Sequence, residues 1–258
     1  MRHWPRIVLA TLFAMAVSLP LAAAETEGVH CSSVVDQDGD EVILLESEWI
    51  SMHLLPRMQA IINRFVFRPT GNDIEEALHP KIRMMGGGIL MDCLWEQDWR
   101  FQELKEKPYQ YKITKNGPEE GQVVFETDIV GWIGSDNSGV ISKLLSNQTL
   151  RRTVTLKSGQ PFFRFDFEFV NNDKNAKRPT FWAHNASVIT TDGDESVIRP
   201  SARGITELCG LYGASFESDH YILDFNKGWT ARMARGRKEG IVYLVDYDYV
   251  EMLYNCNN

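Results

Sequence analysis

Hydrophobic and polar residues alternate along much of the chain, and the alternation is strictest between Phe163 and Phe169. Phenylalanine occupies every second position there, with Arg164, Asp166 and Glu168 between. Because successive side chains of a strand point to opposite faces of a sheet, this pattern predicts a strand with one buried face and one solvated face.

Other segments carry similar signals, and turn residues separate them. Apolar and β-branched positions predict further strands in the ranges 42–56 (two short segments), 109–114, 122–130, 146–156, 229–234 and 240–247. The connectors are polar, as in Lys157-Ser158-Gly159-Gln160 and Asn171-Asn172-Asp173-Lys174-Asn175. Short strands joined by such turns predict an all-β fold, an antiparallel β-sandwich with few short helices.

The N-terminus has a different pattern. Two arginines lie in the first six residues, an apolar run extends from Ile7 to Ala24, and the run ends in three alanines. A basic start, an apolar centre and small residues at the end are typical of a secretory signal peptide. An uncleaved membrane anchor is the alternative, but the run is short for a span and contains Pro20. We therefore expect removal of residues 1–24. The remainder, 25–258, is expected to be a single β-sandwich domain, secreted or periplasmic, without a stable membrane span.

Charge and cysteine content narrow the expected partners and compartment. The 258-residue chain has a formal net charge of −8, and loss of Arg2 and Arg6 with the leader changes it to −10. The sequence has no basic stripe with interleaved aromatic residues, so we expect no nucleic-acid partner. Four cysteines fall in the expected exported part: Cys31, Cys93, Cys209 and Cys256. In an oxidising compartment they allow two disulfides, and free buried thiols are the alternative.

The stretch from Gly86 to Leu104 combines two kinds of side chain that bind sugars. Aromatic faces stack on the C–H patches of sugars, and planar polar groups bond their hydroxyls. Trp95 and Trp99 lie here beside Asp98 and Arg100, after a glycine-rich turn. We expect these four residues to bind a carbohydrate ligand. The alternative is a short helix in which the two tryptophans, four residues apart, form the buried face.

His184 stands in a strand-like segment, with Trp182 two residues before it. Residues two apart share a face of a regular strand, so an imidazole beside an indole suits the floor of a sugar pocket. A neutral imidazole can orient a hydroxyl or transfer a proton, because its reference pKa is about 6.5. A hydrogen-bonded core or surface histidine fits the same pattern, so both interpretations remain open.

Three stretches resemble, in their order along the chain, the galactose-mutarotase-like β-supersandwich superfamily of aldose epimerases and carbohydrate-active enzymes. They are VILLESEWISMHLLPRMQAIINRFVFRPTGNDI from Val42, FRFDFEFVNNDKNAKRPTFWAHNAS from Phe163 and GWTARMARGRKEGIVYLVDYD from Gly228. The second resembles the strand-turn-strand that delivers a histidine onto the concave sheet. The resemblance implies a supersandwich that binds or acts on a sugar or polysaccharide, with His184 and the carboxylate Glu251 as catalytic residues.

The kind of activity stays open at the level of sequence. The chain departs from the aldose epimerases because His79 lies seven residues before Gly86, not beside the glycines. Besides an epimerase-like isomerase, paired carboxylates allow a glycoside hydrolase, with candidates Glu46, Glu48, Asp98 and Glu251. Arginines that neutralise a uronate allow a polysaccharide lyase, with candidates Arg100, Arg152 and Arg199.

A different class of function fits the same residues. The alternative is a non-catalytic accessory or structural sandwich whose ancestral sugar site is lost. The chain ends directly after strand-like residues, so a sandwich that is short at its C-terminus is also considered. We expect no cofactor, and no metal site because histidines and carboxylates do not cluster at ligand spacing. The oligomeric state is left open.

Overall fold

The computed structural model is all-β and confirms the predicted antiparallel β-sandwich. It describes residues 7–12, 28–74, 89, 91–95, 103–104, 107–131, 141–175, 177, 180–185, 189, 195–201, 204–209, 220–222, 228–246 and 253–255. These residues form no helix. Accordingly, no helix long and apolar enough to cross a membrane occurs in this part of the chain.

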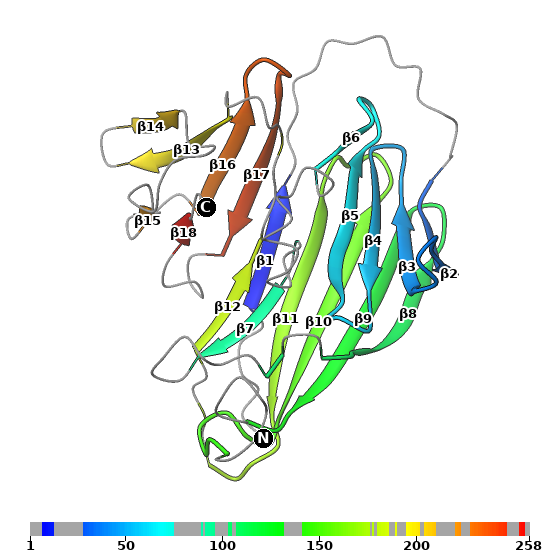
Figure 1. Cartoon of the computed structure of the whole chain (residues 1–258), viewed down its shortest axis with the longest axis vertical. Coiled ribbons are helices and arrows are strands. Elements are labelled where there is room, and N and C mark those ends of the chain that lie inside the picture. Colours follow the sequence, from blue (N-terminus) through cyan, green and yellow to red (C-terminus); the bar gives the residue numbers. More distant parts are fainter. Residues whose placement is uncertain are drawn as a thin grey trace.

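One layer of the sandwich is a five-stranded sheet (Figure 1). Its strands are β2 (His30–Val35), β3 (Glu41–Glu46), β4 (Ile50–Leu55), β5 (Ile61–Phe67) and β6 (Asn72–Asp73). They follow one another in space as they do in the chain. All neighbours are antiparallel, so the sheet is a simple meander.

The other layer is a nine-stranded sheet. Its strands are β1 (Ile7–Leu12), β8 (Gln110–Asn116), β9 (Glu120–Ile129), β10 (Gln148–Lys157), β11 (Phe163–Asn171), β13 (Glu195–Ser201), β14 (Gly204–Cys209), β16 (Trp229–Ala234) and β17 (Glu239–Val245). Their spatial order is β14-β13-β16-β17-β1-β11-β10-β9-β8. Two ribbons complete the fold: β7 (Met91–Trp95) pairs with β12 (Thr180–His184), and β15 (His220–Ile222) with β18 (Leu253–Asn255).

The core lies between the two sheets and follows the predicted alternation. Phe163, Phe165 and Phe167 of β11 are buried, and Arg164 between them is exposed. Across the layers, the ring of Phe163 lies 5.7 Å from the ring of Phe65 in β5. The alternating polar and apolar positions therefore decide which face of the nine-stranded sheet meets its partner layer.

Cys31 of β2 lies in this core as a free thiol. Burial raises the pKa of the thiol to about 11, because a thiolate would lose its solvation there. The side chains of Cys93 and Cys209 and all of Cys256 lie outside the described part of the structure. The formation of disulfides in the exported chain stays a prediction.

Strand β1 comes from the expected leader. It lies between β11 and β17 and pairs antiparallel with both. This arrangement belongs to the full-length chain. Cleavage of the leader after Ala24 is a separate event and stays a prediction.

Candidate functional site

The ribbon of β7 and β12 brings together three of the residues that the sequence selects. In its register, Thr180 lies opposite Trp95, Trp182 opposite Cys93 and His184 opposite Met91. Directly opposite residues of an antiparallel pair share a face, as do residues two apart on one strand. Trp95, Trp182 and His184 therefore occupy positions on one face of the ribbon.

The other face of the ribbon belongs to the core. Leu94 is buried, and the ring of Phe181 lies 4.7 Å from Phe167 and 5.0 Å from Phe169 of β11. Ala183 packs against the same cluster. These core contacts come from positions 94, 181 and 183, whereas the register assigns positions 95, 182 and 184 to the opposite face of the ribbon.

The remaining predicted site residues either lie outside the described residues or belong to other parts of the sandwich. Asp98, Trp99, Arg100 and Glu251 lie outside the described residues, so their roles stay predictions. Of the other carboxylates considered, Glu46 accepts a hydrogen bond from Ser51 Oγ at 2.7 Å, and Glu48 accepts one from the backbone of Gly159. Both carboxylates hold turns and neighbouring strands of the sandwich.

A buried ion pair lies behind the ribbon. Asp92 of β7 and Arg152 of β10 are fully buried, with 3.2 Å between Asp92 Oδ1 and Arg152 Nη1. Tyr109 Oη donates to Asp92 Oδ2 at 2.8 Å. The guanidinium also lies 5.6 Å from the centre of the Tyr109 ring and 5.9 Å from that of Phe125. The pair connects the ribbon to strand β10 of the larger sheet.

The same two residues hold the tight turn between β4 and β5. Gln59 and Ala60 have φ values of 57° and 51°, a left-handed conformation that non-glycine residues rarely adopt. Arg152 Nη2 donates to the backbone carbonyls of both, at 2.6 Å for Ala60. The side-chain oxygen of Gln59 accepts the backbone N–H of Asp92 at 2.9 Å. The strained turn, the ribbon and β10 therefore form one hydrogen-bonded unit.

Burial is the main cause of the shift in the pKa of Asp92. The loss of solvation raises the pKa of this carboxyl from its ordinary value of 3.8 to about 6. Arg152 and the Tyr109 hydroxyl act in the opposite direction, because both stabilise the carboxylate. This carboxyl faces the core side of the ribbon, so its contacts serve the architecture of the site.

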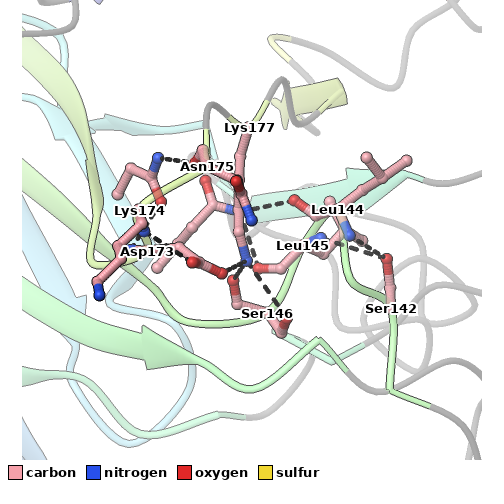
Figure 2. A network of polar contacts seen from close by, with 10 residues as sticks. Ser142, Leu144, Leu145, Ser146, Asp173, Lys174, Asn175 and Lys177 are labelled. Atoms are coloured by element: carbon pink, nitrogen blue, oxygen red, sulfur yellow. Dashed lines mark hydrogen bonds and ion pairs between the residues drawn. The ribbon is translucent and has the colours of Figure 1, made fainter.

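A second polar network anchors the chain just before β12 (Figure 2). Lys177 is buried, and its ammonium group donates to the carbonyl oxygen of Ser146 and, at 3.3 Å, to Ser146 Oγ. It also lies 3.3 Å from Asp173 Oδ2. Gln148 holds the same loop through the carbonyl oxygens of Leu144 and Leu145. The segment leading to His184 is therefore fixed to the loop that precedes β10.

Sequence reasoning missed these networks for different reasons. The position of Arg152 carries a signal, because it interrupts an apolar row with Leu150 and Val154 on the same face of the predicted strand. A charge in such a row needs a buried partner. Asp92 lies sixty residues earlier in the chain, and no spacing rule connects the two. Within the described residues, no group of histidines, cysteines and carboxylates could hold a metal ion.

No protein-family model matches the chain, and no curated protein sequence matches it. Among solved structures, a TPR-domain-containing protein from Parabacteroides distasonis has a TM-score of 0.56 and 12% identity, over 98% of this chain and 45% of that one. A 4-alpha-glucanotransferase from Thermococcus litoralis has a TM-score of 0.45 and 11% identity, over 89% and 38%. This chain thus spans less than half the length of either protein. The first likeness shows a shared fold alone, and the second is too weak to carry an argument.

Proposed function

We propose that this chain is an exported carbohydrate-binding or carbohydrate-active β-sandwich protein of the galactose-mutarotase-like kind, with its sugar site on the outer face of the β7–β12 ribbon. The observation that carries the proposal is the register of the ribbon. It gives Trp95, Trp182 and His184 neighbouring positions on one face, although the first is distant in sequence from the other two. Two indoles beside an imidazole match the stacking and hydrogen-bonding groups that sugars need.

The rigid support behind the ribbon adds to this proposal. Binding sites work best when the elements that carry them are held in place by packing and by further hydrogen bonds. Here Leu94 and Phe181 pack into the core, and the Asp92–Arg152 pair joins the ribbon to β10. Lys177 fixes the approach to β12. These contacts support a face whose geometry is set before a ligand arrives.

The test is ligand-observed saturation-transfer NMR with the processed chain against pooled neutral and uronate oligosaccharides. We expect transfer to at least one pool, with the signal lost or strongly reduced in Trp182→Ala and in His184→Ala. His30→Ala is the matched control, because His30 is an exposed histidine on β2 of the five-stranded sheet. Circular dichroism and thermal denaturation of each variant separate a lost contact from a lost fold.

The same samples, followed for hours, separate an enzyme from a binding protein. New sugar signals that disappear in His184→Ala assign a catalytic role to the histidine. Transfer without turnover supports the non-catalytic alternative. If no pool shows transfer to a folded wild-type chain, or if both variants bind like wild type, the sugar site on this ribbon is wrong.

A further inference from the structure

Strand β1 connects two halves of the nine-stranded sheet. One half consists of β11, β10, β9 and β8, and the other of β17, β16, β13 and β14. Residues 7–11 lie opposite Phe163–Phe167, and residues 9–12 lie opposite Val242–Val245. In the described structure no other strand bridges β11 and β17.

Removal of the expected leader would take β1 out of the middle of this sheet. Neighbouring strands lie about 4.8 Å apart, so β11 and β17 would then face each other across about 10 Å, the room for a single strand. Backbone N–H and C=O groups along both edges would lose their partners. Such groups are costly when buried, and an exposed strand edge readily pairs with another chain.

Contacts to the five-stranded sheet hold strands β11 and β17 apart. Asn72 Nδ2, on β6, donates to Glu239 Oε2 at the start of β17 at 2.7 Å. Asn72 Oδ1 accepts from Arg237 Nη1, in the β16–β17 turn, at 2.8 Å. On the other side of the slot, β11 is fixed by the core contact between Phe163 and Phe65. Direct pairing of β11 with β17 would require these anchors to move by about one strand spacing.

We propose that the slot between β11 and β17 is a strand-acceptor site. Residues 7–12 fill it in the full-length chain, and an extended apolar segment of a partner polypeptide fills it after the leader is removed. Main-chain hydrogen bonds to both edges supply the affinity, as in other cases of β-strand addition. This inference does not depend on the proposed sugar site.

The register defines the chemistry of the occupant. Positions 7, 9 and 11 lie opposite Phe167, Phe165 and Phe163, which are buried, so the occupant needs apolar or β-branched residues at alternate positions. The positions between lie opposite Asp166 and Arg164 on the solvated face, where small or polar residues fit. A proline in the segment would remove a main-chain donor and abolish pairing.

The test is hydrogen–deuterium exchange on two forms of the protein. One is the full-length chain made without export, and the other is the processed chain recovered after export. We expect those amides of Phe163–Phe167 and Val242–Val245 that point toward β1 to exchange at least about tenfold faster in the processed chain, because an open edge is unprotected. Amides of Val123–Phe125 in β9, which has neighbours on both sides, serve as the internal control.

A synthetic peptide of residues 6–13 should restore slow exchange at both edges of the processed chain. The same peptide with Leu9→Pro should not. Three results would each overturn the proposal. They are slow exchange in the processed chain without any peptide, a wild-type peptide that does not protect the edges, and a leader that stays attached after export. Protection that coincides with a dimer by light scattering would assign the slot to a second copy and would also overturn it.

Discussion

Arg151 and Arg152 are consecutive residues of β10 that lie on opposite faces of the nine-stranded sheet. Arg152 is fully buried against Asp92. Arg151 is partly exposed and pairs with Glu126 of β9 at 2.8 Å and Glu168 of β11 at 2.7 Å. Strand β10 thus contains one buried and one partly exposed arginine at consecutive positions.

The first prediction concerns this pair of arginines. Arg152→Met should lower the free energy of unfolding at pH 7 by about 3–5 kcal/mol, because it leaves a buried carboxylate without its partner. The carbonyls of Gln59 and Ala60 lose a donor at the same time. Arg151→Met should change stability by about 1 kcal/mol or less, since exposed ion pairs contribute little.

Urea denaturation of both variants at pH 7 measures the difference. The double variant Arg152→Met/Asp92→Asn should recover part of the loss, because the uncompensated charge is gone. Equal losses for Arg151→Met and Arg152→Met would show that the buried pair does not support the fold.

The second prediction is a pH dependence caused by Asp92. Its pKa of about 6 in the folded chain lies above the ordinary value of 3.8, so the folded state binds this proton more tightly than the unfolded state does. The stabilisation from this carboxyl is complete below pH about 4 and is lost as the pH rises through about 6. A shift of two pKa units corresponds to about 3 kcal/mol.

Denaturation curves between pH 4 and pH 7 test this prediction by comparison with Asp92→Asn. The difference in unfolding free energy between wild type and Asp92→Asn should change with pH in this window and become flat above it. In Arg152→Met, the Asp92 carboxyl loses the positive charge that favours its ionised form. The destabilisation caused by Arg152→Met should therefore be smaller near pH 4, where the carboxyl is protonated, than at pH 7. A difference that does not vary with pH would contradict the assigned pKa.

The third prediction concerns the lysine that anchors the chain before β12. Lys177→Met should cost about 1–3 kcal/mol, because the half-buried carbonyl of Ser146 loses its donor. Lys174→Met, at an exposed position three residues earlier, should stay within about 0.5 kcal/mol of wild type.

An NMR titration gives a second readout for Lys177. The hydrogen bond from Lys177 is the main cause that holds the pKa of Asp173 below its ordinary value. This pKa should rise in Lys177→Met and stay in place in Lys174→Met. An unchanged Asp173 pKa in Lys177→Met would show that the two side chains do not interact in solution.

The fourth prediction concerns two glycines and separates the cost of a left-handed backbone from the cost of a steric clash. Gly131 has φ of +85°, and an added Cβ would lie 2.6 Å from the backbone nitrogen of Ser146. Gly159 has φ of +75° with open space around it. Gly159→Ala should cost about 1–2 kcal/mol for the left-handed backbone alone, and Gly131→Ala about 2–4 kcal/mol, because a steric clash is added.

Thermal and urea denaturation of the two variants give these values. The buried carboxylate of Glu103 accepts the backbone N–H of Gly131 at 2.6 Å, so the chain cannot shift there without straining that bond. A smaller loss of unfolding free energy for Gly131→Ala than for Gly159→Ala would contradict this prediction. It would mean that the loop around Ser146 moves to accommodate the added Cβ.

Local patterns located several strands closely and missed others. The predicted strand at 229–234 has the bounds of β16, and the alternation from Phe163 marks β11. Strands β13 and β14 were not predicted, because Glu195–Ser201 contains buried serine and glutamate and a proline instead of a clear alternation. Glu195 is acceptable there because Arg232 of β16 lies 2.5 Å away, a partner that only the folded chain supplies.

The sequence by itself determined the all-β sandwich, the buried face of its central strands and the shared face of Trp182 and His184. These features follow from the two-residue period of a strand, which neighbouring positions set. Only the tertiary structure decided that Trp95 joins that face, that Asp92 meets Arg152, and that residues 7–12 lie between β11 and β17. Each of these depends on which strands pair and in what register, and that choice is made by burial across the whole core.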